Sequence, residues 1–367
     1  MEITDLLIST SKNGASDLHI SAGNPPLMRV DGDMLPINAP KLGPDDVKNM
    51  LYSIMTEQQR SEYEQDLEID FSISFGEEMR FRVNAFNTIN GPGGVFRTIP
   101  TKILSLDQLK TPPILAQLCH LHKGLILVTG PTGSGKSTTL AAMVNYINEN
   151  FSRHILTIED PVEFVHQTKR SLINQREVGA STKSFARALK SALREDPDVI
   201  LVGELRDLET IHLAMTAAET GHLVMGTLHT TSAPKTIDRI IDVFPADDKE
   251  MVRAMLSMSL EAVIAQTLLK KKGGGRVASH EILLGTPAIR NLIREGKVPQ
   301  IYSMMQMGSK LGMTTMKDSM YKLLDEGIVD AEDIKDYIMK SGEEESDSGG
   351  RNNRPATSRR PEATGTF

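Results

Sequence analysis

The chain has 367 residues, enough for about two domains with cores of their own. Hydrophobic residues make up 39% of the chain and charged residues 24%, as in ordinary soluble globular proteins. The net charge of −7 argues against nucleic acid or an anionic membrane as a partner, and the single cysteine, Cys119, excludes an internal disulfide framework and a four-cysteine zinc site. The sequence has no signal-peptide pattern and no apolar run near the ~20 residues that span a bilayer, so we expect a cytoplasmic protein.

The first hundred residues predict a small α+β domain. Hydrophobic residues recur at helical spacing over residues 45–66, whereas residues 71–75 and 79–85 alternate in the manner of strands. A Gly-Pro-Gly-Gly turn is expected to join the second of these strands to the next, which places Arg82 close to Arg97. A proline-containing linker over residues 101–112 then leads into the second half of the chain.

Residues 113–340 predict an α/β domain with a parallel sheet, because buried-strand candidates alternate with helical segments. These candidates are residues 125–129, 154–158, 199–202 and 223–227. A mostly helical portion follows. Residues 341–367 are polar and charged and contain almost no apolar residue, so they are predicted to form a disordered tail.

A phosphate-binding loop lies between a predicted strand and a predicted helix. Residues 130–137 read G-x-x-x-x-G-K-S, a pattern in which backbone N–H groups surround the phosphates of a nucleotide. Lys136 can reach the β- and γ-phosphates, and the Ser137 hydroxyl can ligate Mg²⁺. The predicted nucleotide-binding residues are Gly130, Pro131, Thr132, Gly133, Ser134, Gly135, Lys136, Ser137 and Thr138.

Acidic residues follow two of the predicted strands. Glu204 comes directly after the strand at residues 199–202, in the pattern of a Walker B motif with Glu where Asp is commoner. Glu159, Asp160 and Glu163 follow the strand at residues 154–158. Because ligand sites of parallel sheets lie at the carboxyl ends of strands, these acids are candidates for binding metal and orienting water. The second group also fits an ordinary acidic surface loop.

Two histidines and two arginines complete the set of candidates. His222 and His229 flank the strand at residues 223–227, where they are either phosphate sensors or ordinary core and surface residues. Their spacing does not match a zinc motif. Arg82 and Arg97 are candidate arginine fingers for the γ-phosphate, although a solvated basic strand face fits the pattern as well.

The order of these motifs resembles the secretion ATPase superfamily and, within it, the type IV pilus retraction ATPases. Beside the P-loop, residues 157–164 resemble the family's Asp box, residues 198–207 its Walker B box and residues 221–231 its His box. Residues 15–20 and 29–32 are similar to the start of the family's PAS-like N-terminal domain, and the second half of the chain resembles its RecA-like ATPase domain. The resemblance implies a hexameric ring.

The resemblance also implies roles for the candidate residues. ATP would lie between the two domains, with the neighbouring subunit completing the site, and the family's arginines correspond to Arg82 and Arg97. Lys136 would bind the phosphates, and Ser137 and Glu204 would hold Mg²⁺. Glu163 would polarise the attacking water. How this role divides between Glu163 and Glu204 is left open. The histidines, His222 and His229, would couple the nucleotide state to domain rotation.

As a family member, the chain would be a homohexameric ATP-hydrolysing motor that works with the pilus machinery. It would turn an inner-membrane platform protein, at the cytoplasmic face of that membrane and attached through partners, and so power pilus retraction and twitching motility. The alternatives are a pilus-assembly or secretion ATPase of the same superfamily, a slow nucleotide-gated regulatory module and a nucleic-acid translocase. The acidic residues argue against the regulatory module, and the net charge argues against the translocase.

Residues 288–295 favour retraction over assembly, because they are similar to a signature of retraction ATPases. They predict an amphipathic helix that Thr286 caps, with Pro287 at its first position and Gly296 at its end. Core packing accounts for its apolar stripe. The polar residues Arg290, Arg294 and Glu295 are expected to remain free for a partner. The lack of an additional N-terminal domain and of a tetracysteine element is expected of a retraction ATPase too.

Overall fold

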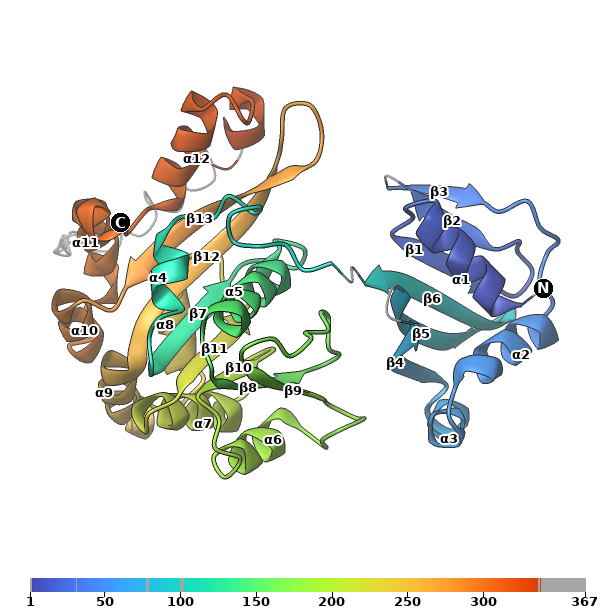
Figure 1. Cartoon of the computed structure of the whole chain (residues 1–367), viewed down its shortest axis with the longest axis horizontal. Helices are drawn as coiled ribbons and strands as arrows, with labels where there is room; N and C mark the ends of the chain where they lie inside the picture. Colours follow the sequence, from blue (N-terminus) through green and yellow to red (C-terminus); the bar gives the residue numbers. More distant parts are fainter. Residues whose placement is uncertain (1, 31, 77–78, 100–101, 336, 338–367) are drawn as a thin grey trace, which may run out of the picture.

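The computed structural model describes residues 2–30, 32–76, 79–99, 102–335 and 337. The described residues form two sheets, which lie towards opposite ends of the long axis of the molecule (Figure 1). The mixture of an antiparallel sheet with helices and a mainly parallel sheet with helices confirms the predicted fold class, α+β followed by α/β.

The first sheet is antiparallel, with six strands in the order β3-β2-β1-β6-β5-β4. Three helices pack on it, and the fully buried side chains of Leu18, Leu51, Phe81 and Phe96 lie in the core between sheet and helices. The elements are α1 (Ile3–Lys12), β1 (Asp17–Ser21), β2 (Leu27–Val30), β3 (Asp33–Pro36), α2 (Pro44–Ile54), α3 (Glu57–Asp66), β4 (Glu68–Phe75), β5 (Met79–Thr88) and β6 (Gly91–Ile99).

Two details of the predicted N-terminal half are wrong. The expected helix over residues 45–66 is two helices, because Met55 is extended and Thr56 begins a new helix with a capping box. The Thr56 hydroxyl accepts from the N–H of Gln59, whose side chain accepts from the N–H of Thr56. The Gly-Pro-Gly-Gly segment is not the turn but the start of β6, and Ile89 and Asn90 connect the strands instead.

The second sheet has seven strands in the order β13-β12-β7-β11-β10-β8-β9, all parallel except β13. Its strands are β7 (Gly124–Thr129), β8 (His154–Glu159), β9 (Leu172–Glu177), β10 (Val199–Val202), β11 (Leu223–Leu228), β12 (Leu260–Lys270) and β13 (Arg276–Leu284). Each of the four strands predicted from apolar runs lies within one of these, and the strands β7, β10 and β11 are buried along their whole length.

Helices cover both faces of this sheet (Figure 1). Alternate residues of β7 enter different cores: Leu125 packs with α6, α7 and α8, whereas Ile126 packs with α4 and α5. The helices are α4 (Ile114–Leu118), α5 (Lys136–Asn150), α6 (Phe185–Ala192), α7 (Leu208–Glu219), α8 (Ala233–Asp242), α9 (Lys249–Ser259), α10 (Pro287–Arg294), α11 (Ile301–Met307) and α12 (Met316–Asp325), with short 3-10 turns at Ala246–Asp248, Val298–Gln300 and Ser309–Leu311.

Helix α10 has the predicted cap and apolar face. The Thr286 hydroxyl accepts from the N–H of Ile289, and Ile289 and Ile293 are fully buried. One expectation for its polar face is wrong, because Arg290 is already engaged within the chain. Its guanidinium donates to the carbonyls of Gly285, Ser257 and Met258 and pairs with Glu261 at 2.7 Å.

Within the described ranges, the helices are all too short or too polar to cross a membrane. The predicted disordered tail, residues 341–367, lies outside the described residues. The carboxyl ends of β7, β8, β10 and β11 point the same way, and the P-loop, the Asp box, the Walker B box and the end of the His box follow them in turn. This edge of the sheet is where the candidate site lies.

Candidate functional site

The P-loop connects β7 to α5 and depends on two glycines. Gly130 and Gly135 have φ angles of 141° and 88°, which L side chains rarely adopt. A Cβ atom at Gly130 would lie 2.2 Å from the carbonyl oxygen of Gln266, and one at Gly135 would lie 2.8 Å from its side-chain nitrogen. Glycine is therefore required at both positions by conformation and by space.

Gln266, in β12, forms hydrogen bonds that hold the P-loop in place. Its side-chain nitrogen donates to the carbonyl oxygen of Ser134 at 2.7 Å, and its side-chain oxygen accepts from the Thr139 hydroxyl at 2.7 Å. All three residues are buried, so these bonds fix the loop to the sheet and to the start of α5. The sequence analysis missed Gln266, although a single amide within an apolar buried strand was a usable signal.

Lys136 begins α5 and folds back over the loop. Its ammonium group donates to the carbonyl oxygens of Gly130 at 2.8 Å and Pro131 at 3.0 Å. Burial lowers the pKa of Lys136, and the charges of Glu204 and Glu163 partly oppose that effect. The N-terminal N–H groups of α5 lie beside this ammonium group, an arrangement that binds phosphate.

Glu204 follows β10 and contacts the side chains of Arg206 and His229. Its carboxylate lies 2.8 Å from the guanidinium of Arg206 and 3.2 Å from Nε2 of His229. Burial raises the pKa of Glu204, but the hydrogen bonds and charges of Arg206 and His229 outweigh burial and hold that pKa below its usual value. The Walker B carboxylate is thus kept ionised. Arg206 was missed in the sequence, where an Arg beside an acid is an ordinary surface pattern.

The Asp box follows β8 and supplies a second set of carboxylates. Glu159 accepts hydrogen bonds from the Thr157 hydroxyl at 2.7 Å, from Gln175 at 3.3 Å and from the N–H of Glu163 at 3.4 Å. Burial raises the pKa of Glu159 despite these bonds. Glu163 itself is exposed at its side chain and reaches the cavity described below.

Arg82 and Arg97 come from the first sheet. They are directly paired across β5 and β6, as the sequence predicts. Nε of Arg97 lies 3.0 Å from Asp17, and Nε of Arg82 lies 3.9 Å from Asp70. Arg97 is thus oriented by a hydrogen bond to Asp17, whereas Arg82 has only a distant acidic neighbour, and both guanidinium groups have further N–H groups available.

These groups converge on one cavity of about 590 Å³. Its lining residues come from both sheets, and it combines the phosphate loop with acids and arginines. They include Thr132, Gly133, Gly135, Lys136, Ser137 and Thr138 of the P-loop, Glu159, Asp160 and Glu163 of the Asp box, Glu204, Arg206 and His229, and Arg82, Arg97 and Arg276. Arg276, at the start of β13, was not among the sequence candidates. The arginine pair thus lines the same cavity as the P-loop of its own chain.

Some predicted residues do not line this cavity. His222 lies at the opposite end of β11 from His229, and its ring contacts the carbonyl oxygen of Ala217 at 3.0 Å. The structure therefore brings His229 but not His222 to the site. Gly130, Pro131 and Ser134 shape the P-loop without lining the cavity.

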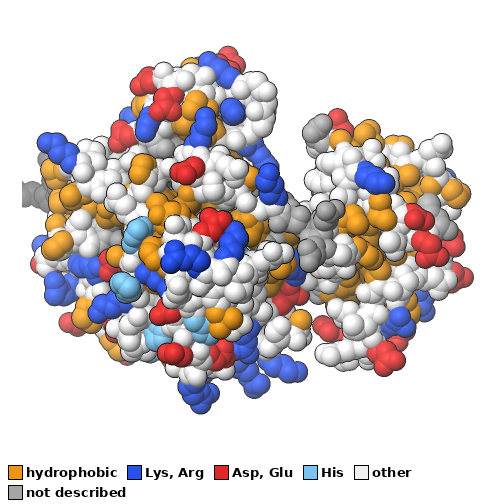
Figure 2. Space-filling model, viewed as in Figure 1, with side chains coloured by type: hydrophobic (Ala, Val, Ile, Leu, Met, Phe, Trp, Pro, Cys, Tyr) orange, Lys and Arg blue, Asp and Glu red, His pale blue; other side chains and the backbone are white. Residues whose placement is uncertain are grey.

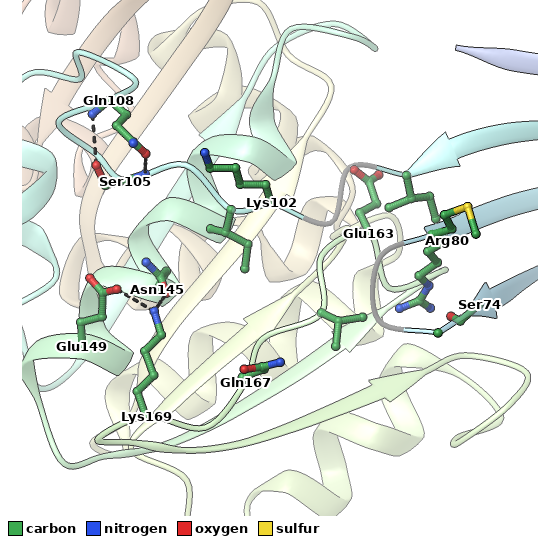
Figure 3. A pocket seen from close by; sticks show the side chains of 15 residues that line it. Ser74, Arg80, Lys102, Ser105, Gln108, Asn145, Glu149, Glu163, Gln167 and Lys169 are labelled. Atoms are coloured by element: carbon green, nitrogen blue, oxygen red, sulfur yellow. Dashed lines mark hydrogen bonds and ion pairs between the residues drawn. The ribbon is translucent and has the colours of Figure 1, made fainter. Parts of the chain in front are cut away.

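A second cavity, of about 670 Å³, lies beside the first and shares Glu163 and Ile99 with it. Figure 3 shows Ser74 and Arg80 at one end of this cavity, and Asn145, Glu149 and Lys169 at the other. No P-loop residue lines it, so the phosphate chemistry belongs to the first cavity.

The first cavity offers suitable ligands for Mg²⁺. The Ser137 hydroxyl and the Glu204 carboxylate both line it, and Mg²⁺ prefers oxygen ligands of this kind, together with water and phosphate. Among the described residues, no group of three or more His, Cys, Asp or Glu side chains is arranged to hold a metal ion. A P-loop site needs no such group, because the nucleotide supplies part of the coordination.

Comparison with known proteins identifies the family of the chain. Residues 2–336 match the family model described as type II/IV secretion system protein. The chain belongs to this family. It is 59% identical to the type IV pilus retraction ATPase PilT of Pseudomonas aeruginosa over 92% of this chain and 98% of that protein. It is 63% identical to a twitching motility protein of Neisseria gonorrhoeae, over 83% of this chain and 82% of the relative.

A solved structure agrees with the family assignment. The crystal structure of the pilus retraction motor PilT with bound ADP has a TM-score of 0.85 and 49% sequence identity to this chain, and the match covers 91% of this chain and 96% of that one. The match therefore includes residues of both sheets.

Proposed function

We propose that this protein is the ATP-driven motor of type IV pilus retraction. It hydrolyses ATP to ADP and phosphate and couples the reaction to mechanical work that disassembles the pilus and drives twitching motility. The observation that carries the proposal is the single cavity in which Lys136, Glu204, Glu163 and the arginine pair meet. The near full-length similarity to a pilus retraction ATPase identifies the process that this ATPase serves.

The site residues divide the work of phosphoryl transfer. The P-loop N–H groups and Lys136 bind the phosphates, and Arg82 and Arg97 neutralise the charge that develops on the γ-phosphate. Ser137 and Glu204 would hold Mg²⁺, which when bound would neutralise negative charge on the phosphates. Glu163 orients and polarises the attacking water as a general base. Two observations support Glu163 as the general base. Glu163 lies on the cavity wall, whereas the carboxylate of Glu204 is already in contact with Arg206 and His229.

The histidines fit the coupling of nucleotide state to movement. His229 contacts Glu204 and lies at the cavity, so loss of the γ-phosphate would change its surroundings first. His222, at the far end of the same strand, would transmit a change only through β11.

The working assembly is proposed to be a homohexameric ring at the cytoplasmic face of the inner membrane. It contacts that membrane through partners, the inner-membrane platform protein and the pilus machinery, and takes no nucleic acid. On the face that Figure 2 shows, basic side chains alternate with acidic ones, which is unlike the basic patch of a nucleic-acid-binding protein. We assign a PAS-like domain to residues 1–100, a linker to residues 101–112 and the RecA-like ATPase domain to residues 113–340.

A clean deletion of the coding sequence in the parent bacterium tests the process. Cells that keep or accumulate surface pili but lose twitching motility are the expected result, and complementation with Lys136→Ala should leave the defect in place. Bald cells would instead identify an assembly ATPase and overturn the proposal. A purified full-length chain that turns over ATP no faster than its Lys136→Ala variant would indicate a slow regulatory module.

A further inference from the structure

Glu177, the last residue of β9, accepts hydrogen bonds from both halves of the molecule. From the first sheet, the Arg80 guanidinium donates to its carboxylate at 2.9 Å and the Ser72 hydroxyl donates at 3.0 Å. From the second half, the backbone N–H of Val162 donates to the same carboxylate at 3.0 Å. The Ser72 hydroxyl also accepts from Arg80 at 3.0 Å, so the group is internally connected.

Each donor lies close to a residue of the nucleotide site, either along the chain or across a pair of strands. Val162 directly precedes Glu163, within the Asp box. Ser72 is paired across β4 and β5 with Arg82, and Arg80 lies two residues before Arg82 on the same strand face. A single carboxylate therefore connects the strand of an arginine finger to the loop of the proposed general base.

The contact is shielded from water. Only 12% of the Arg80 side chain and 17% of the Glu177 side chain are exposed. A charge-assisted hydrogen bond in such surroundings is stronger and less screened than a surface ion pair. In Figure 3, Arg80 projects at the end of the larger cavity that holds Glu163, at the junction of the two halves.

We propose that Glu177 is a positioning residue. It ties the N-terminal sheet to the Asp box and thereby fixes the positions of Glu163 and Arg82 relative to each other. The inference rests on the proposed roles of Glu163 and Arg82 in hydrolysis. Glu177 touches neither substrate nor water in this role. It acts through the Val162 amide on one side and through Ser72 and Arg80 on the other, so that movement of the N-terminal sheet moves the Asp box with it.

Loss of this contact is expected to affect the rate of hydrolysis by displacing the catalytic groups. A shift of about 1 Å in a catalytic group can cost up to about 100-fold in rate. Loss of the tie is therefore expected to lower kcat and leave nucleotide binding intact, because the P-loop is held separately by Gln266.

The test uses the full-length protein with the variants Glu177→Ala, Glu177→Gln and Arg80→Ala. We expect Glu177→Ala to lower kcat about 10-fold, with the KM for ATP changed less than about twofold. Glu177→Gln keeps an acceptor for the Val162 N–H but loses the charge that holds Arg80, so its kcat should be intermediate. If Glu177 and Arg80 act through each other, the double alanine variant should be no slower than Glu177→Ala alone.

Glu195→Ala is the matched control. Glu195 pairs at 2.8 Å with Arg176, the neighbour of Glu177 in β9, and this ion pair is also partly buried but lies within the second half alone. Its removal should leave kcat unchanged. A drop equal to that of Glu177→Ala would mean that any ion pair near β9 has this effect, and the proposal would be wrong.

A distance measurement tests the tie without reference to turnover. Spin labels at Ile89→Cys and Lys123→Cys, both exposed and in different halves, report the interdomain distance by pulsed EPR when labelled chains are diluted with unlabelled ones. Burial raises the pKa of Cys119 to about 12, so the native thiol stays unreactive during labelling near neutral pH. The distance distribution should broaden in Glu177→Ala and Arg80→Ala but not in Glu195→Ala.

The two measurements separate this inference from the proposed function. A Glu177→Ala protein with wild-type kcat and a wild-type distance distribution would overturn the tie, even if Glu163→Gln is inactive. If Glu163→Gln instead hydrolyses ATP normally, the assignment of the general base fails, and the distance distributions still decide whether Glu177 joins the two halves.

Discussion

At the level of single residues, His280 in β13 shows how burial alone can keep a titratable side chain uncharged. Its side chain is almost completely buried, and its Nε2 atom has no hydrogen-bond partner among the described residues. Burial lowers the pKa of His280 from 6.5 to about 4. The ring is therefore neutral in the folded protein at every pH at which the protein is expected to work.

This burial predicts an acid-dependent loss of stability. Between pH 6.5 and pH 4 the unfolded chain binds a proton at His280 that the folded chain does not, so stability is complete above pH 6.5 and falls as the pH decreases. We expect His280→Leu to abolish about 2.5 kcal/mol of the loss between pH 7 and pH 4.5, measured as unfolding free energies in urea. The exposed control His122→Leu should retain the wild-type dependence. Parallel pH curves for His280→Leu and the wild type would contradict the prediction.

The acidic site residues could be found in the sequence, but their partners could not. Glu204 follows the short, fully buried strand β10, and Glu163 follows β8, which is buried except at its two ends; a parallel sheet puts such strand ends together. Arg206 offers no comparable signal, because its role depends on the direction in which a short loop folds. Glu177 is recognised only through Arg80, a residue distant in the sequence and on the other sheet.

At the level of elements, the P-loop needs glycine for two reasons, the backbone conformation and the space left for a side chain. Gly130 and Gly133 both have positive φ angles, but a Cβ atom would meet the Gln266 backbone only at Gly130. We expect Gly130→Ala to weaken ADP binding at least about 10-fold more than Gly133→Ala, because the clash with a buried strand cannot relax. Isothermal titration calorimetry measures both. Equal losses would show that backbone conformation, and not the approach of β12, is the dominant constraint.

Helix α10 offers a similar matched pair on its polar face. Arg290 is bound to three carbonyl oxygens and to Glu261, whereas Arg294 is exposed and donates a long hydrogen bond to Asn291 at 3.4 Å. We expect Arg290→Ala to lower the unfolding free energy by about 2 kcal/mol and Arg294→Ala to leave it unchanged. If Arg294 faces a partner, its variant should reduce twitching motility at normal protein levels. A stable Arg290→Ala protein would contradict this account of α10.

Elements differed in how well the sequence predicted them. The central strands were predictable because burial on both faces gives continuous apolar runs. The break between α2 and α3 was missed since no Gly or Pro marks it, although Thr56 and Gln59 carry the capping-box pattern. The Gly-Pro-Gly-Gly segment was taken for a turn, but it lies in β6, where Gly93 and Gly94 leave room for Phe86 and Leu51.

At the level of the whole molecule, the site depends on two sheets that meet within one chain. The P-loop and the acids belong to the second sheet, the arginine pair belongs to the first, and all line the same cavity. The sequence predicted both sets of residues and the family resemblance predicted that ATP lies between the domains. Neither local patterns nor spacing could indicate which subunit's arginines face a given P-loop.

The cavity predicts that each chain supplies its own arginines. Mixing Arg97→Ala chains with Lys136→Ala chains should therefore give no recovery of ATP hydrolysis, because every site contains one defect from its own chain. If the arginines acted on a neighbouring subunit, about one site in four of a randomly mixed ring would carry both intact groups. Steady-state hydrolysis after subunit exchange distinguishes the two arrangements. Energy transfer between two fluorescently labelled pools of chains confirms that exchange occurs, and a clear recovery in the first mixture would place Arg97 in trans.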